Sequence, residues 1–353
     1  MSFKQTLKDI YHENTRFRFL YNMKRWGIVS GAMILVSLGF LLTQGLSLGI
    51  DFTGGTAFTI PEPKQVEQIT SSDVSDILQK EDVKESRIQF VNKTSIRVQT
   101  ESLDKAERTK LSQTFADSTK QDIKRISIDQ VGPTWGQTVS KNAVKAMLVF
   151  FVIVALYLTV RFEMSMGISA IFTVLHDIIL VAGVYSITSL EVTPATVVAL
   201  LTILGFSLYD TVVVFDQIRL GSERLYKLKD TSYTFMANKA LNSVLMRSIN
   251  TTIVAILPVL SLIIVGSFLL GAVALLDFAV ALLAGLTTGA YSSIFVSAPV
   301  ALLIKRRQPW VSELETRFYA KDEASLSNEV SEESSTANTS AVNKDRPSKK
   351  KQY

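Results

Sequence analysis

Residues 205–220 read GFSLYDTVVVFDQIRL and close an apolar run that begins near Ala195. The run is long enough to cross a bilayer, because a helix needs about 20 apolar residues to span the hydrocarbon core. Asp210 lies well inside this run. A carboxylate at that depth costs roughly 2.5–3.5 kcal/mol on insertion scales, so Asp210 is a candidate functional residue.

The rest of the chain has the same block pattern. It has 353 residues, of which 47% are hydrophobic and 20% are charged, with no Cys and only two His. The absence of Cys excludes disulfides and thiolate sites, and two His make a multi-His metal site a poor fit. The apolar blocks predict an α-helical polytopic membrane protein with six transmembrane helices. They lie at about 27–48, 142–160, 166–187, 195–218, 250–270 and 278–304.

The distribution of Lys and Arg predicts the orientation. Residues 1–26 are polar and basic, and the first apolar block after them is too long for a cleaved signal peptide. The loops near 188–194 and 271–277 hold no Lys or Arg, whereas the loops between them and residues 305–307 are basic. Both termini are therefore expected in the cytoplasm. The tail 305–353 is expected to be disordered from about 321 and solvated, in preference to docking on the bundle.

The polar segment 51–141 is long enough for a small extracytoplasmic domain. Its alternation and helical spacing give the order β-α-β-β-α-β, which is that of a ferredoxin-like α+β unit. Residues 92–94 form the expected hairpin turn. The expected elements are strands at 55–60, 87–91, 95–99 and 126–131 and helices at 71–79 and 103–115.

Polar residues inside the other spans surround Asp210. Asp177 lies near mid-depth of the third block, at a height comparable to that of Asp210 in the neighbouring antiparallel span. Arg247 is the only cation expected near the two carboxylates. Asp216 and Arg219, close to the cytoplasmic end of the fourth block, are expected to be interfacial anchors.

Two interpretations of these groups remain open. In one, Asp210 exchanges a proton and Arg247 responds to its charge, since burial and a nearby cation shift a carboxyl pKa in opposite directions. In the other, Asp210 and Arg247 form a static pair. Asp177 is expected to be a supporting partner rather than the primary carrier. The small residues of the sixth block are expected to form a packing seam, and they are Ala281, Gly285, Gly289, Ser293 and Ser297.

Several motifs carry a resemblance to a known family. Residues 49–56 read GIDFTGGT, 210–219 read DTVVVFDQIR, 175–177 read LHD and 291–295 read YSSIF. Over roughly residues 15–305 the chain resembles SecF-type members of the SecD/SecF family of protein-export membrane proteins. The resemblance implies half of an RND-type bundle, completed to twelve spans by SecD. It matches Asp210 and Arg247 to the family's key aspartate and arginine.

The resemblance also implies a function. Such proteins work with SecD beside the SecYEG translocon in the bacterial plasma (inner) membrane. They use the proton-motive force, or sodium in some members, to promote late steps of export of unfolded polypeptides. No cofactor and no nucleic-acid partner are implied, and lipid surrounds the spans. Three positions depart from the family pattern, and the main one is Tyr209 in place of Asn; the other two are Phe206 and Leu220.

The glycine-rich motif around Asp51, Gly54 and Gly55 has a structural explanation. Glycines permit a tight turn where the chain leaves the membrane for its first strand. A phosphate-binding loop would need a following helix N-terminus, and a strand is expected here. No Walker motif or nucleophile–base set is present, so we do not expect an enzyme. Two other functions remain as alternatives, a small-molecule efflux half-transporter and a passive scaffold for SecD and the translocon.

Overall fold

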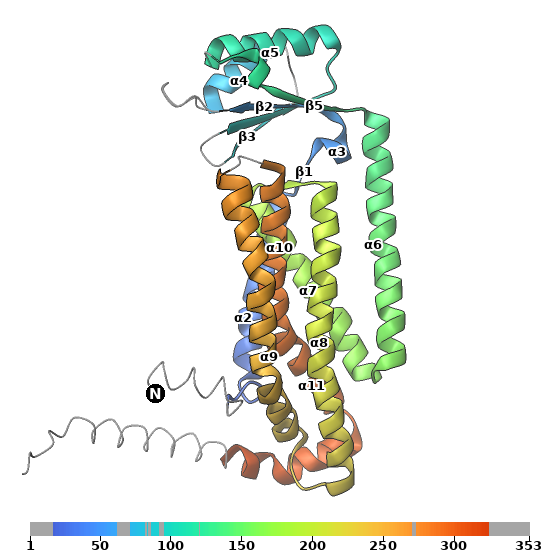
Figure 1. Cartoon of the computed structure of the whole chain (residues 1–353). Helices are drawn as coiled ribbons and strands as arrows, with labels where there is room; N and C mark the ends of the chain where they lie inside the picture. The colour runs from blue at the N-terminus through green and yellow to red at the C-terminus, as the bar shows by residue number, and fades with distance from the viewer. Residues whose placement is uncertain are drawn as a thin grey trace, which may run out of the picture.

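The computed structural model describes residues 17–61, 71–81, 83, 86–91, 95–119, 121–269 and 273–324. The protein is an α-helical polytopic membrane protein with a small α+β domain at one end of the bundle (Figure 1). Six helices are long and apolar enough to cross a membrane. They are α2 (Met23–Thr43), α6 (Pro133–Arg161), α7 (Met164–Thr188), α8 (Pro194–Leu228), α9 (Tyr233–Ser261) with η2 (Leu262–Leu269), and α10 (Val273–Ser292) with η3 (Ser293–Ser297) and α11 (Ala298–Lys305).

The small domain is ferredoxin-like, as the order of elements predicts. Its antiparallel sheet has the strand order β3-β4-β2-β5, and its two helices cover one face (Figure 1). Phe58 and Phe115 pack edge to face in its core. The expected hairpin turn 92–94 lies outside the described residues. The elements are β2 (Gly55–Pro61), α4 (Ser71–Lys80), β3 (Ser86–Val91), β4 (Ser95–Thr100), α5 (Lys105–Thr119), η1 (Ile123–Arg125) and β5 (Ser127–Val131).

Most of the helices extend beyond the apolar blocks that predict them, whereas α2 ends before its block does. The expected domain range 51–141 is too long, because α6 already begins at Pro133, a residue favoured at the first position of a helix. The first span occupies 23–43 and not 27–48. The chain after it forms β1 (Ser47–Leu48) and α3 (Ile50–Thr53), and β1 pairs in parallel with β6 (Glu191–Val192). Hydropathy marks the apolar part of a helix, whereas the polar turns at its ends extend past that part.

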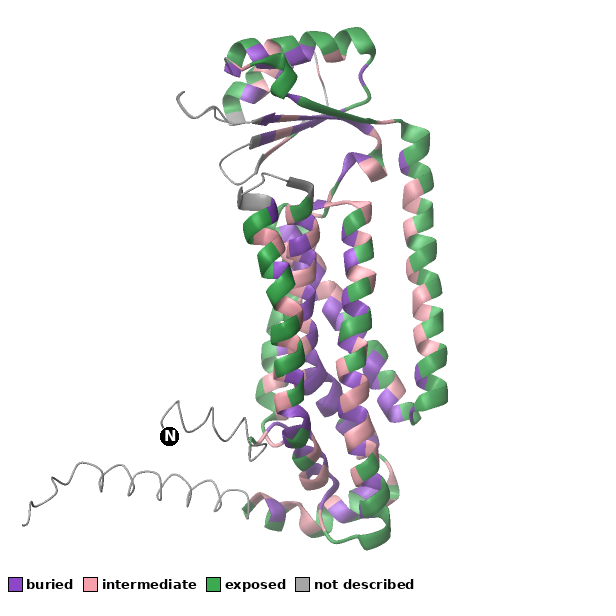
Figure 2. Ribbon diagram, in the orientation of Figure 1, coloured by how far each residue is buried: buried purple, intermediate pink, exposed green. Residues whose placement is uncertain are grey.

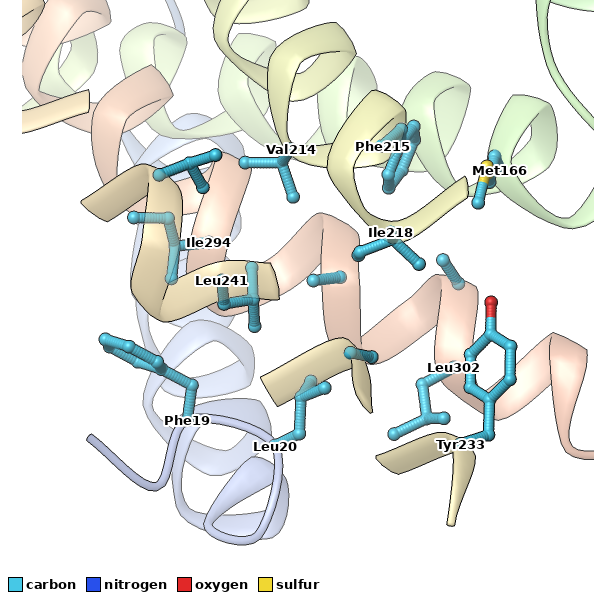
Figure 3. Close-up of a cluster of buried hydrophobic side chains, with 14 of the residues drawn as sticks. Phe19, Leu20, Met166, Val214, Phe215, Ile218, Tyr233, Leu241, Ile294 and Leu302 are labelled. Carbon is cyan, nitrogen blue, oxygen red and sulfur yellow. The ribbon is translucent and has the colours of Figure 1, made fainter. Parts of the chain in front are cut away.

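The bundle has a domain end, which meets the ferredoxin-like domain, and an opposite far end. At the far end a cluster of apolar side chains joins the segment before α2 to α7, α8, α9, η3 and α11 (Figure 3). Phe19 and Leu20 enter this cluster from residues 17–22, beside Leu241 of α9. The N-terminal segment is therefore anchored in the core from Phe19 onward.

The expectation of a solvated tail from about residue 321 is wrong for residues 321–324, which belong to a helix at 309–324. This helix packs on the start of α9. The Asp322 carboxylate accepts a hydrogen bond from the Ser232 backbone N–H at 2.7 Å, and Glu315 accepts one from the Thr234 N–H at 2.7 Å. The first turn of a helix leaves N–H groups without partners inside the helix, and carboxylates satisfy them. Residues 325–353 of the expected disordered tail lie outside the described residues.

This capping predicts a stability effect. Replacing Glu315 by Ala removes the bonds to Thr234 and the ion pair to Arg306 at 3.0 Å. Because loss of a helix cap costs about 0.5–2 kcal/mol, we expect the free energy of unfolding to fall by about 1–2 kcal/mol. Glu313→Ala, at an exposed position on the same helix, is the matched control. Thermal unfolding in detergent with equal midpoints for the two variants would contradict the docked helix.

Helix α6 stands apart from the other spans in Figure 1. Figure 2 shows it exposed or intermediate along nearly its whole length, and of its residues only Gly136 and Leu158 are buried, in a helix that the structure describes throughout. It contacts α3 near its start and α7 and α8 near its end. The apolar flanks between these contacts face lipid or another protein.

Candidate ion-coupling site

The first carboxylate of the site, Asp177, is enclosed at the junction of α7, α8 and α10. Its side chain is 1% exposed. One oxygen accepts hydrogen bonds from Ser207 of α8 at 2.6 Å and from Ser292 of α10 at 2.9 Å. The other oxygen lies 3.0 Å from Nδ1 of His176, whose Nε2 is buried with no hydrogen-bond partner among the described residues. Asp177 therefore joins three helices through a fully enclosed polar contact.

The second carboxylate, Asp210 of α8, is half-buried and has a different setting. One oxygen accepts a hydrogen bond from Ser248 of α9 at 2.7 Å, and the other accepts one from Ser293 of η3 at 2.5 Å. Asp210 also lines a cavity of about 470 Å³ between α8, α9 and α10. Phe206, Ala255 and Leu286 line the cavity on the domain-end side of Asp210. The cavity therefore lies on the domain-end side of Asp210, and the hydroxyls of Ser248 and Ser293 contact its carboxylate.

Two adjacent serines connect the surroundings of the two carboxylates. Ser292 is the last residue of α10 and Ser293 is the first residue of the π-helical stretch η3. Successive helical residues point about 100° apart, so the two hydroxyls reach different neighbours, Asp177 and Asp210. Short π-helical segments inside α-helices occur frequently at functional sites. Any shift in this segment would change both carboxylate contacts together.

Arg247 does not pair with Asp210 in this structure. It is exposed on α9, and its Nη2 donates a hydrogen bond to the Tyr209 hydroxyl at 3.1 Å. Among the described residues, Asp210 forms no ion pair within 4 Å. The static Asp–Arg pair considered from the sequence is therefore absent. Residues 209 and 210 instead contact residues 247 and 248 as two adjacent links between α8 and α9.

The serine contacts were only partly visible in the sequence. Ser207 lies three residues before Asp210 in α8, and its hydroxyl donates a hydrogen bond to Asp177 instead. Ser293 was expected to be part of the packing seam, and the link through Ser248 and Ser292 was missed. The seam itself is confirmed at Gly289, where an added Cβ would lie 2.9 Å from the Cβ of Ser207. The close approach of α8 and α10 at this glycine brings Ser207 and Ser292 onto one carboxylate oxygen.

Asp216 and Arg219 lie at the far end of the bundle and not in the site. Asp216 Oδ1 pairs with Arg161 Nη2 of α6 at 2.9 Å and with Arg219 Nη2 at 3.1 Å. All three side chains are about a third exposed. The cluster ties the end of α6 to α8, and exposed pairs of this kind contribute at most about 1 kcal/mol each.

The glycine-rich motif forms the link between the first span and the domain. Asp51 lies in α3, and the chain then turns through Gly54 at φ 76° and Gly55 at φ 132° into β2. A Cβ on Gly54 would lie 2.9 Å from the Cα of Pro133, and one on Gly55 would strike the Thr100 carbonyl oxygen. The expected tight turn is confirmed, and the glycines also permit close packing on α6 and β4.

This geometry predicts that Gly55 tolerates no side chain. Residues held in sparsely populated backbone regions cost about 1–3 kcal/mol, so Gly55→Ala should lower the free energy of unfolding by at least that amount. Gly132→Ala is the matched control, because Gly132 has an ordinary negative φ and nothing within 4 Å of its added Cβ. Thermal unfolding of both variants checks the expectation, and equal loss in both would contradict it.

The described residues contain no group of three or more His, Cys, Asp or Glu that could hold a metal ion. The chemistry available at the site is therefore that of carboxylates and hydroxyls. Such groups exchange protons, and their oxygens are also ligands of the kind that hard cations prefer.

Comparisons with known proteins agree with this architecture. Residues 111–307 match the model of the family described as protein export membrane protein SecD/SecF, C-terminal, and residues 39–61 match the SecD/SecF GG motif. The chain is 35% identical to protein translocase subunit SecF of Streptomyces coelicolor over 312 residues, covering 88% of this chain and 83% of that protein. The chain belongs to the SecD/SecF family.

A solved structure supports the fold. The crystal structure of SecDF, a translocon-associated membrane protein from Thermus thermophilus, matches with a TM-score of 0.73 at 33% identity, covering 84% of this chain and 39% of that one. The SecD/SecF C-terminal match includes Asp177, Asp210 and Arg247. The GG-motif match includes Asp51, Gly54 and Gly55. Both parts of the candidate machinery therefore lie inside the regions that define the family.

Proposed function

We propose that this protein is an accessory subunit of the Sec protein translocase, which with a SecD partner uses the proton-motive force to promote late steps of protein export. The names of its relatives, protein translocase subunits SecF and SecDF, support the translocase role. The chain covers 38% of the SecDF protein of Thermus thermophilus, a relative whose name joins SecD and SecF, which supports association with a SecD-like half.

One observation carries the ion-coupling part of the proposal. Asp210 belongs to a membrane-spanning helix and lines a cavity between helices. Its carboxylate accepts hydrogen bonds from two serines and pairs with no cation among the described residues. A group that can be reached and that lacks a fixed counter-ion can take up and release a proton. Asp177 is enclosed by three helices, so its role is to hold them together around Asp210. The coupling ion is a proton, and the hydroxyl-rich surroundings leave sodium as the alternative.

The direction of coupling follows from the charge distribution. The far end carries Arg161, Arg219 and Arg306, whereas the short connections at the domain end, 189–193 and 270–272, hold no Lys or Arg. By the positive-inside rule both termini are then cytoplasmic, in a bacterial plasma (inner) membrane, and the ferredoxin-like domain is outside. The cavity at Asp210 then lies on the exterior side of that carboxylate, and we infer that protons reach Asp210 from the exterior, the side of higher proton concentration.

Arg247 supports the presence of a partner. Its guanidinium is exposed next to Ser248, at the depth of Asp210, and it has one hydrogen bond, to Tyr209, among the described residues. A guanidinium facing lipid at that depth is costly, so a polar surface must meet it there. The second half of the transporter, SecD, is the partner of suitable position. The SecYEG translocon and the exported unfolded polypeptide complete the proposed set of partners.

Two other functions remain to be tested against this one. A small-molecule efflux half-transporter is disfavoured, because the described residues contain a single small domain outside the bundle. A passive scaffold would need no titrating carboxylate. The discriminating experiment is proton uptake by vesicles that contain the protein and SecD, with Asp210 intact and with Asp210→Asn.

A further inference from the structure

The connection between α7 and α8 is held to the ferredoxin-like domain and to the linker before that domain. Gln89 of β3 donates a hydrogen bond from Nε2 to the Ser189 carbonyl at 2.5 Å. The Gly49 N–H donates to the Val192 carbonyl at 2.9 Å, next to the parallel pairing of β1 with β6. The segment 189–193 joins the two helices that carry Asp177 and Asp210. The domain therefore rests on the hairpin that holds both carboxylates.

A buried charge lies at the centre of this contact. Glu191 of β6 is 1% exposed, and its carboxylate lies 3.3 Å from Nε of Arg97 on β4, which is 12% exposed. Neither carboxylate oxygen has a hydrogen-bond partner among the described residues, and the same holds for Arg97 Nε and Gln99 Nε2. The ionised carboxylate is therefore buried without the hydrogen bonds that would compensate for the loss of water, and its attraction to Arg97 offsets that loss only in part.

The other charges around Glu191 come from three elements. Arg87 of β3 adds positive charge, Asp51 of α3 adds negative charge, and Asp277 of α10 is 5% exposed and lies beside the Glu191 backbone. Burial raises the pKa of Glu191 above its ordinary value. Arg97, Arg87 and the nearby Gln99 side chain oppose this shift, and Asp51 adds to it. The docked domain therefore favours the protonated form of this carboxyl.

We propose that Glu191 positions the ferredoxin-like domain on the α7–α8 hairpin and that docking tightens when its carboxyl takes up a proton. The sign follows from linkage, because the state in which a group has the higher proton affinity becomes more populated as pH falls. An undocked domain exposes Glu191 to water, where its affinity for a proton is that of a free carboxyl. At pH values between the pKa of Glu191 in the docked state and its pKa in the undocked state, acidification shifts the equilibrium toward docking. Below the pKa of the undocked state the effect levels off.

This inference extends the proposed function and rests on it for the location of the domain outside the membrane. If the domain lies outside, the proton gradient acidifies the compartment that contains Glu191. The gradient would then hold the domain on the α7–α8 hairpin. The same hairpin carries Asp210, the residue proposed to take up the coupling proton. An exported chain that meets the domain would encounter a firmly seated surface while the membrane is energised, and a looser one when it is not.

Because the chain has no Cys, two introduced cysteines can carry spin labels. Ser118→Cys on α5 and Thr188→Cys at the end of α7 are both exposed. We expect the distance distribution between the labels, measured on the full chain in vesicles without a gradient, to narrow as pH is lowered from about 8 to about 5. Glu191→Gln, which resembles the protonated form, should give a narrow distribution at every pH and lose the pH response.

Three further variants sharpen the test. Arg97→Gln leaves an ionised Glu191 without its cation, so the distribution should broaden at high pH and recover on acidification. Glu101→Gln, an exposed carboxylate of the same domain, should keep the response of the parent protein. Asp210→Asn should also keep the pH response of the distance distribution. A failure of the docking proposal is therefore distinguishable from a failure of ion coupling at Asp210. A parent distribution that is identical at both pH values, or a response that survives Glu191→Gln, would overturn the proposal.

Discussion

Asp210→Asn is expected to abolish the stimulation of export by the ion gradient while leaving the complex with SecD intact. Asparagine has nearly the same shape as aspartate, and its carbonyl oxygen can still accept a hydrogen bond from Ser248 or Ser293. The packing of α8 against α9 and η3 should therefore persist. The amide cannot take up and release a proton near neutral pH, so the variant should lose the coupled step.

The measurement compares proton uptake and gradient-dependent translocation in vesicles that contain the variant or the parent protein. Asp230→Asn, an exposed aspartate in the connection between α8 and α9, is the matched control and should retain full activity. Co-purification of SecD with each variant reports on assembly. Export that stays gradient-dependent in Asp210→Asn would favour the passive scaffold and exclude Asp210 as the coupling group.

The second large effect concerns stability and Asp177. Replacing Asp177 by Ala removes the hydrogen bonds from Ser207 and Ser292, leaves His176 without its carboxylate, and opens a void in a fully enclosed site. Interhelical hydrogen bonds in membrane bundles contribute about 0.6 kcal/mol on average and at most about 1.7 kcal/mol. With the void included, we expect the free energy of unfolding to fall by about 2–4 kcal/mol.

Asp177→Asn separates charge from packing at the same position. It keeps the shape and an acceptor for one serine, so its loss of stability should be about 1 kcal/mol or less. Asp210→Ala should also lose less than Asp177→Ala, because Asp210 is half-buried and borders a cavity. Unfolding in mild detergent, followed by helical circular dichroism, ranks the variants. A loss from Asp177→Ala no larger than that from Asp210→Ala would show that Asp177 does not hold the three helices together.

The sequence predicts the parts of this protein that depend on one element at a time. Hydropathy locates six spans, because each span must be apolar over a fixed length. Alternation predicts the strands of the domain, because residues such as Phe58, Ile60, Ile96 and Val98 face one core. The depth of Asp210 follows from its place in its own helix. Each of these features is encoded within a short stretch of chain.

Contacts between elements were harder to predict. The sequence leaves open a static pair between Arg247 and Asp210, which the structure does not have, because the direction of Arg247 depends on how α9 is rotated against α8 and on the phenol of Tyr209. The roles of Ser292 and Ser293 depend on the change from α- to π-helix between them, which no local residue pattern announces. The sequence predicts no helix at 309–324 and a solvated tail from about 321, because nothing local shows that Glu315 and Asp322 cap another helix.

The central claim is that the carboxyl of Asp210 changes its protonation state from the exterior side of the membrane. Infrared difference spectroscopy of oriented vesicles tests it directly, with the Asp210→Asn variant identifying the band. Lowering the exterior pH should produce the carbonyl stretch of a protonated carboxylic acid in the parent protein, and this band should be absent from the variant. A spectrum with Asp210 ionised at every exterior pH would contradict the account.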